Sequence, residues 1–173
     1  MIDFSDIHYL SHGNDRQRKL FQVLQSHVIL RKLSGFDPIV IGSIPIGIDI
    51  PGSDVDIACQ FGNREAFVKE LTSQFSNHQD FLIKVRAPDD LQTVTATFWL
   101  SGFVFEIFGQ LIPVRYQLGY RHLIIEHRIL EQKGEAFRNE ILRLKSSGIK
   151  TEPAFAKALG IKGEGYLELL QFE

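Results

Sequence analysis

Several kinds of residue and segment are scarce in this chain, and each scarcity excludes a class of protein. A single cysteine, Cys59, rules out a disulfide within the chain, so we expect a reducing cytoplasm as its location. No stretch approaches the roughly 18 uninterrupted apolar residues that a membrane-spanning helix requires, so no membrane partner is expected. The chain begins with Asp3, Asp6 and His8 before any apolar run, which argues against a secretory signal peptide.

An excess of basic charge is also missing. Lysine and arginine total 19 against 21 aspartate and glutamate residues, and the net charge is −2. A chain of this charge has no overall attraction for nucleic acid, so we expect no long nucleic acid duplex as a partner. Its 173 residues, 44% of them hydrophobic and 23% charged, suit one soluble globular domain with or without a helical appendage.

The most informative stretch is residues 40–59, which read V-I-G-S-I-P-I-G-I-D-I-P-G-S-D-V-D-I-A-C. A short apolar run ends abruptly at Gly42 and Ser43, as a buried strand does where the backbone must come close to another group. A loop rich in glycine and proline follows. This pattern predicts a strand whose end forms one edge of a site.

A pair of acids follows that loop. Residues 53–59 predict a second strand, in which the period of two places Asp54 and Asp56 on one face. Adjacent carboxylates repel one another, and a hard cation such as Mg²⁺, which prefers oxygen ligands, relieves the repulsion. Taken alone, the pair is more typical of a turn residue followed by a solvated strand residue, because most aspartates are exposed.

A resemblance to a known superfamily rests on the pattern G-S at 42–43, G at 47 and S-D-V-D at 53–56. It resembles the signature of the nucleotidyltransferases related to DNA polymerase beta, in which a strand ending in Gly-Ser leads through a glycine turn to a strand opening with Asp-x-Asp. One position departs from the signature, since Ile46 stands where many members have arginine or another polar residue. Residues 120–155 further resemble an uncharacterised bacterial family in this superfamily.

The resemblance implies a third acid on a neighbouring strand. The run F-V-F-E-I-F at 103–108 supplies Glu106, a carboxylate that is costly to bury in an apolar strand unless it is paired or liganded. The resemblance then implies that Asp54, Asp56 and Glu106 are the catalytic residues and hold Mg²⁺ or Mn²⁺. As an alternative, Glu106 is an edge-strand charge that discourages aggregation.

The nucleotide would lie beside these acids. Gly42 and Ser43 are expected to bind the phosphates of a nucleoside triphosphate. Arg121 and His122 offer donors for the triphosphate or a surface for the base, or else they only pair with Glu126 on the protein surface.

The remaining periodicity predicts an α+β fold, a nucleotidyltransferase-like mixed β-sheet with flanking helices and a C-terminal helical segment. The chain would divide into a core at residues 1–112, which includes an N-terminal helix, and a helical segment at residues 113–173. Strands are predicted at 38–41, 53–59, 81–86, 91–100 and 103–109, and helices at 14–33, 63–75, 116–132, 135–146, 151–160 and 166–172. Asp89 and Asp90 fall in a predicted turn and are expected to be solvated.

Together these features favour a metal-dependent nucleotidyltransferase that transfers a nucleotidyl group from a nucleoside triphosphate to an unknown acceptor hydroxyl. The acceptor is a small molecule or a macromolecule. A non-catalytic nucleotide-binding or partner-binding module on the same fold is the alternative. A phosphohydrolase, in which water replaces the acceptor, is a third hypothesis.

Overall fold

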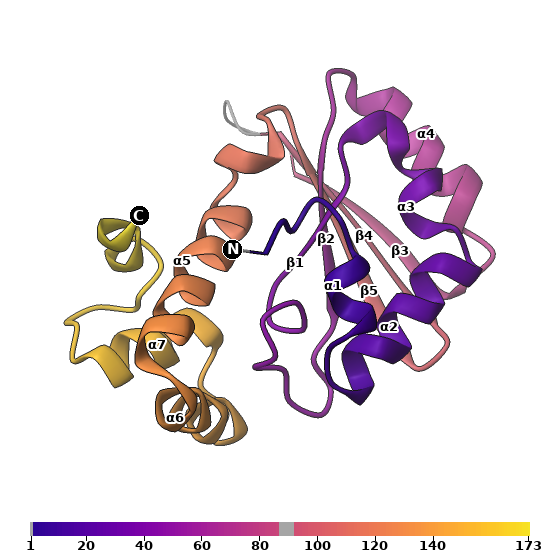
Figure 1. Cartoon of the computed structure of the whole chain (residues 1–173). Helices are drawn as coiled ribbons and strands as arrows, with labels where there is room; N and C mark the ends of the chain where they lie inside the picture. Colours follow the sequence, from indigo (N-terminus) through magenta and orange to yellow (C-terminus); the bar gives the residue numbers. More distant parts are fainter. Residues whose placement is uncertain (1, 87–91) are drawn as a thin grey trace.

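The computed structural model describes residues 2–86 and 92–173 (Figure 1). Its centre is a five-stranded mixed sheet in the order β1-β2-β5-β4-β3. The strands are β1 (Ile39–Ile41), β2 (Val55–Gln60), β3 (Gln79–Arg86), β4 (Thr93–Leu100) and β5 (Phe103–Gln110). β2 and β5 are parallel, and the other neighbouring pairs are antiparallel. The predicted α+β class is therefore confirmed.

Helices lie on both sides of this sheet (Figure 1). One side carries α1 (His8–Ser11), α2 (Asp15–Ser26), α3 (Ile29–Lys32) and α4 (Arg64–Phe75), and the other carries α5 (Leu118–Lys133), α6 (Glu135–Ser146) and α7 (Thr151–Leu159). Short 3₁₀ turns complete the chain: η1 (Ser34–Phe36), η2 (Val114–Tyr116) and η3 (Glu168–Phe172). Among the described helices, none has both the length and the apolar character needed to cross a bilayer.

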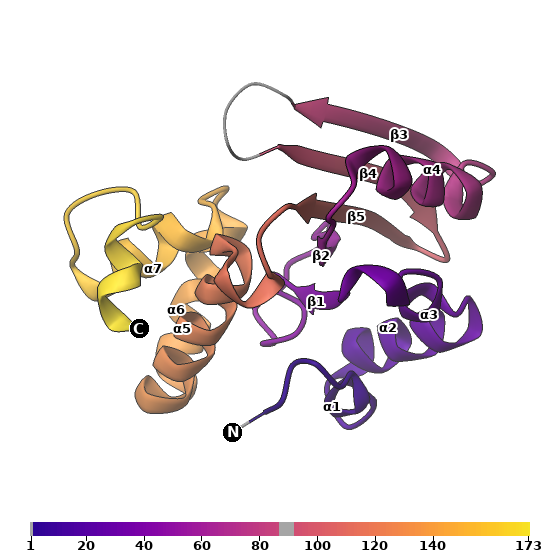
Figure 2. The ribbon, with the colours of Figure 1, turned by 90° about the horizontal axis from the view of Figure 1, so that it is seen from above.

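The two faces of the sheet bury different cores. The first core joins α2, α3 and α4 to one sheet face through Leu20, Phe67 and Phe105 and their neighbours. The second joins α5–α7 to Ile39 of β1 and Ala58 of β2 on the opposite face. In Figure 2, α5–α7 lie near β1 and β2, and β3 is the sheet edge farthest from them. The C-terminal helices therefore cover only part of this second face.

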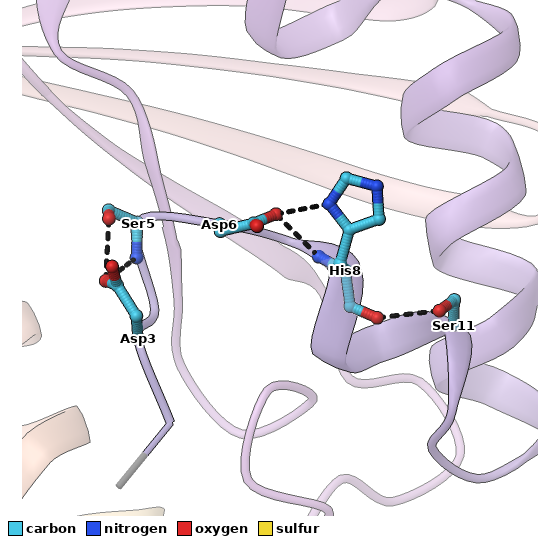
Figure 3. Close-up of polar contacts among 5 residues, drawn as sticks. All are labelled: Asp3, Ser5, Asp6, His8 and Ser11. Atoms are coloured by element: carbon cyan, nitrogen blue, oxygen red, sulfur yellow. Dashed lines mark hydrogen bonds and ion pairs between the residues drawn. The ribbon is translucent and has the colours of Figure 1, made fainter.

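The N-terminal arm is held by short-range hydrogen bonds (Figure 3). The Asp3 carboxylate accepts hydrogen bonds from the backbone and hydroxyl of Ser5, and the Asp6 carboxylate accepts one from the backbone N–H of His8. These turns place Phe4, which is 1% exposed, in the second core. The arm thus contributes packing to the C-terminal half.

Helix starts were predicted well, and one helix was predicted too long. Asn14 begins α2 with a capping box to Gln17, and Asn63 caps α4. The predicted helix at 14–33 is interrupted, because Val28 adopts a left-handed conformation with φ of 49°. The predicted helix at 166–172 is the 3₁₀ turn η3.

Two further predictions concern the turn before β4 and the division of the chain into two parts. The turn at 88–90, with Asp89 and Asp90, and the start of the strand at Leu91 lie outside the described residues. The division into residues 1–112 and 113–173 stays a prediction. The buried amide of Gln117 joins the two parts, since it donates to the carbonyl oxygen of Cys59 at 2.8 Å.

Candidate active site

The candidate site is built on two neighbouring parallel strands. The register of β2 and β5 pairs Asp56 with Glu106, and that of β1 and β2 pairs Asp56 with Ile41. Residues paired in register point to the same sheet face, so both carboxylates lie on the face that α5–α7 partly cover. Asp54 immediately precedes β2 and lines the same cavity.

This cavity has a volume of about 670 Å³, within the range of small-molecule and cofactor sites. The sheet and its loops supply Gly42, Ser43, Asp54, Asp56 and Glu106 to the lining. The opposite wall comes from the C-terminal helices and the segment that follows them, and it includes His122, Glu126, Lys145, Glu152 and Tyr166. The cavity therefore lies between the two parts of the chain.

Burial and neighbouring negative charge disfavour the ionised forms of Asp56 and Glu106. Burial, together with the charges of Asp54, Glu106 and Glu152, raises the pKa of Asp56 to about 7, and Lys145 only partly opposes this. Burial and the charge of Asp54 also raise the pKa of Glu106, although Lys84 acts in the opposite direction. Among the described residues, the charges of Lys145 and Lys84 only partly offset the rise in these two pKa values.

The chemistry of these donors fits a hard divalent cation that also binds a ligand's phosphates. Asp54 and Asp56 offer carboxylate oxygens, and Mg²⁺ commonly takes one or two carboxylates together with phosphate oxygens and water. Within residues 2–86 and 92–173, no group of three or more Asp, Glu, His or Cys side chains is arranged to hold an ion. The predicted role of Asp54, Asp56 and Glu106 as joint metal ligands therefore stays a prediction.

Gly42 allows the backbone to approach the acids. Its φ is +82°, and a Cβ at this position would lie 2.2 Å from Oδ2 of Asp56. Any larger residue would strain the backbone and displace the carboxylate. The abrupt end of β1 at Gly42 thus has a direct steric reason.

The loop that connects β1 and β2 is held from outside the cavity. The side-chain amide of Gln17 donates to the carbonyl oxygens of Ile44 at 2.8 Å and Pro45 at 3.1 Å. The Arg138 guanidinium donates to the carbonyl oxygen of Ile46, whose own side chain is buried at 5% exposure. The apolar side chain at the position that departs from the superfamily signature therefore packs in the second core.

His122 and Glu152 form a polar pair on the opposite wall. The Nδ1 atom of His122 lies 3.4 Å from Oε1 of Glu152, and its Nε2 atom lies 2.7 Å from the carbonyl oxygen of Tyr166. Burial disfavours the imidazolium, yet Glu152 and the Tyr166 carbonyl raise the pKa of His122 overall. Burial would raise the pKa of Glu152, but the hydrogen bond and charge of His122 lower it overall. An imidazolium-carboxylate pair is favoured here.

Glu126 and Lys145 are two buried residues that also line this wall. Glu126 is 3% exposed, and burial raises the pKa of its carboxyl well above the usual range. In the described part of the chain, its Oε1 atom has no hydrogen-bond partner. Lys145 is 6% exposed and donates from Nζ to Oγ1 of Thr151 at 2.9 Å. Lys145 brings a cation to the cavity opposite the sheet acids.

The structure separates the two residues predicted as a nucleotide-binding pair. His122 lines the cavity, whereas Arg121 does not. Arg121 instead forms a bidentate pair with Glu173, with distances of 2.8 and 2.6 Å. The alternative that both pair with Glu126 on the surface is wrong, because the Glu126 side chain is buried.

Sequence reasoning missed Lys145, Glu126 and Glu152 as cavity residues. A signal was present for the first two, since helical spacing places Lys145 on the face of Ile141 and Glu126 on that of Leu123. A charged residue on the apolar face of a helix is a candidate for a buried polar site. Glu152 gives no such signal, because it falls in the first turn of α7, where acids are common.

Comparisons with known proteins place these features in context. A family model described as "Domain of unknown function (DUF4269)" matches residues 22–172. No curated protein matches the sequence. Solved structures do match, and their low sequence identities mean that the likeness shows the fold alone.

Three of these similar structures have the nucleotidyltransferase fold. The Cid1 poly(U) polymerase with MgGTP bound has a TM-score of 0.58 and 14% identity, over 84% of this chain and 49% of its own. The GLD-2/RNP-8 complex has a TM-score of 0.54 and 13% identity, over 88% of this chain and 61% of its own. A cytoplasmic RNA terminal U-transferase has a TM-score of 0.52 and 16% identity, over 84% of this chain and 46% of its own. This chain thus spans about half the length of most of these proteins.

Proposed function

This chain belongs to the family described as Domain of unknown function (DUF4269), and from its site we propose that it is a metal-dependent nucleotidyltransferase. It would transfer a nucleotidyl group from a nucleoside triphosphate to an acceptor hydroxyl. The observation that carries the proposal is the pairing of Asp56 with Glu106 in register, beside Asp54 and the Gly42 corner in one cavity. The nucleotidyltransferase fold of the similar structures supports it.

The sheet side of the cavity would hold the metal and the phosphates. Asp54 and Asp56 would bind Mg²⁺ or Mn²⁺, which when bound supplies positive charge to the phosphate oxygens. The hydroxyl of Ser43 and nearby backbone N–H groups would donate to the terminal phosphates. On the opposite wall, Lys145 would add a charge-assisted donor.

Glu106 is proposed to complete a second metal site or to act as the general base. In the transfer, the acceptor oxygen forms a bond to the α-phosphorus, and the bond between that phosphorus and the bridging oxygen to the β-phosphorus breaks. Pyrophosphate leaves with the electron pair, and the acceptor proton passes to a carboxylate. The raised pKa of Glu106 brings it closer to neutral pH, which suits a proton acceptor.

His122 is proposed to position the nucleotide from the C-terminal wall. Its imidazole is already held by Glu152 and by the carbonyl oxygen of Tyr166, so its orientation is fixed before a ligand binds. A fixed polar group loses little entropy on binding. Arg121 is not part of this proposal, because Glu173 occupies its guanidinium.

The test measures the reaction and its dependence on one acid. The purified protein is incubated with Mg²⁺, each α-labelled nucleoside triphosphate and a mixture of hydroxyl-bearing acceptors, and pyrophosphate and labelled adducts are measured. We expect both from the wild type and neither from Asp56→Asn. Asp37→Asn serves as the matched control, because Asp37 lies outside the cavity lining and asparagine tolerates its left-handed backbone.

Two results would contradict the proposal in different ways. Mg²⁺-dependent nucleotide binding without pyrophosphate release, whatever acceptor is supplied, would favour the non-catalytic module. Labelled nucleoside monophosphate as the only product, formed without an acceptor, would indicate that water is the acceptor and would favour a phosphohydrolase.

A further inference from the structure

Beyond the cavity, the sheet face that carries Glu106 continues as a surface that the described part of the chain leaves exposed on β3, β4 and β5. On β3, β4 and β5 the large side chains of this face are exposed: Leu82 at 49%, Trp99 at 43% and Val104 at 46%. The second core covers the same face only at β1 and β2, through Ile39 and Ala58. The candidate acids therefore lie at the border between a covered half and an open half.

Strand pairing places the side chains of the open half in rows that run across the sheet from β5 to β3. One row runs from Glu106 through Thr97 to Leu82. The next runs from Phe108 through Thr95 to Lys84. A third row, one step further along the strands, runs from Gln110 through Thr93 to Arg86.

A hollow of about 270 Å³ lies over these rows, and Glu106 lines both this hollow and the main cavity. Lys84 and Arg86 are exposed along its β3 side, and neither forms an ion pair with any residue of 2–86 or 92–173. Thr93, Thr95 and Thr97 of β4, each of which carries a hydroxyl, also line it. The hollow thus joins two cations and three hydroxyl groups to the proposed reaction centre.

We propose that this hollow is the acceptor site and that the acceptor is a small phosphorylated molecule with a free hydroxyl. The inference rests on the proposed function. Lys84 and Arg86 bind the phosphate, the threonine hydroxyls bind the polar body, and the free hydroxyl lies at Glu106. The acceptor's phosphate and the nucleotide's triphosphate are then held by separate cations, Lys84 and Arg86 on one side and Lys145 on the other.

The dimensions and charge of the hollow favour a small acceptor over a nucleic acid strand. Two strand spacings of about 4.8 Å separate β5 from β3, and the long side chains of Lys84 and Arg86 shorten the span, so a sugar phosphate or a nucleoside monophosphate would bridge it. Two cations suffice for one phosphate. A strand would need a longer positively charged groove, and the net charge of −2 offers no further attraction.

The only tryptophan provides a direct readout. Trp99 lies on the same face, two residues along β4 from Thr97, which lines the hollow. Its fluorescence is measured during titration of the full chain with ribose 5-phosphate, with ribose, and with a four-nucleotide single-stranded oligoribonucleotide. Calorimetry on the same samples measures binding independently of any change at Trp99.

We expect saturable binding of ribose 5-phosphate, with ribose at least tenfold weaker. The double variant Lys84→Gln/Arg86→Gln should bind ribose 5-phosphate with an affinity at least tenfold lower than that of the wild type. Arg31→Gln/Lys69→Gln is the matched control: it removes the same charge from α3 and α4 and should bind as the wild type does. Equal binding of ribose and ribose 5-phosphate, or unchanged binding by the Lys84/Arg86 variant, would overturn the proposal.

The remaining outcomes are also decisive. Binding of the oligoribonucleotide much more tightly than ribose 5-phosphate, with the same loss in the Lys84/Arg86 variant, would replace the small acceptor by a nucleic acid end and overturn the proposal as stated. Binding of Mg·ATP to the wild type is measured in parallel. Its absence would remove the proposed nucleotide site, whereas the sugar-phosphate titration would still report on the hollow alone.

Discussion

Asp56 of β2 and Glu106 of β5 lie side by side on neighbouring parallel strands, at the border of the sheet face that the C-terminal helices cover. Each carboxyl has a raised pKa, for which burial is the main cause. A protein that keeps two such groups adjacent carries an electrostatic cost that a cation with bound phosphates would remove. The proposed function therefore predicts local instability at this site in the absence of a cation.

Replacing Asp56 by asparagine should stabilise the metal-free protein. The pKa of Asp56 rises from 3.8 to about 7, so the stability associated with its protonated form is complete below about pH 3.8 and is lost as the pH rises through about 7. At pH 8 we expect Asp56→Asn to gain about 1 kcal/mol, or roughly 2–4 °C in Tm. Thermal unfolding in EDTA measures this, and a lower Tm than that of the wild type at pH 8 would contradict it.

Gly42→Ala should damage both stability and nucleotide binding. The new Cβ would lie 2.2 Å from Oδ2 of Asp56, at a residue whose φ is +82°. We expect a loss of about 1–3 kcal/mol and a weaker affinity for Mg·ATP. Gly160→Ala is the control, because φ there is +70° and nothing lies within 4 Å of the added carbon. Similar Mg·ATP affinities in the two variants would show that the contact with Asp56 is unimportant.

Lys145→Met should weaken triphosphate binding and leave the chain folded. Lys145 is a buried cation on the wall opposite the sheet acids, and charge-assisted donors to phosphate contribute strongly. We expect an affinity for Mg·ATP at least tenfold lower. Lys157→Met, at an exposed position of α7 outside the cavity lining, should bind normally. Circular dichroism checks folding, and a folded Lys145→Met protein with unchanged affinity would exclude Lys145 from the nucleotide site.

The pair of His122 and Glu152 should stabilise the protein over a defined pH range. The raised pKa of His122 means that its contribution is complete below pH 6.5 and is lost as the pH rises through the folded value. The lowered pKa of Glu152 means that its contribution is present above pH 4.5 and is lost as the pH falls through the folded value. We therefore expect His122→Gln to lower the free energy of unfolding more at pH 6 than at pH 9, as urea denaturation would measure. An equal loss at both pH values would contradict this.

The sequence predicted the sheet side of the site because local rules determine it. The period of two along β5 sends Phe105 to the core and Glu106 to the other face, and the glycine at 42 ends β1. Asn14 and Asn63 identify helix starts by hydrogen bonds that reach only three residues along the chain. Such features need no knowledge of the tertiary structure.

The C-terminal wall could not be predicted in the same way, because distant contacts determine it. Arg121 pairs with Glu173, 52 residues further along the chain, and it does not line the cavity. His122 is oriented by the carbonyl oxygen of Tyr166, a group that every residue possesses. Periodicity shows that Lys145 lies on an apolar helix face, but only packing reveals that this face borders the cavity.

A crystal structure with Mn²⁺ and a non-hydrolysable nucleoside triphosphate tests the central claim most directly. We expect anomalous density for Mn²⁺ between the carboxylates of Asp54 and Asp56, with the triphosphate between Ser43 and Lys145 and with Glu106 facing the α-phosphate. Mn²⁺ and triphosphate bound elsewhere on the protein, with Asp54 and Asp56 making no contact to either, would contradict the account.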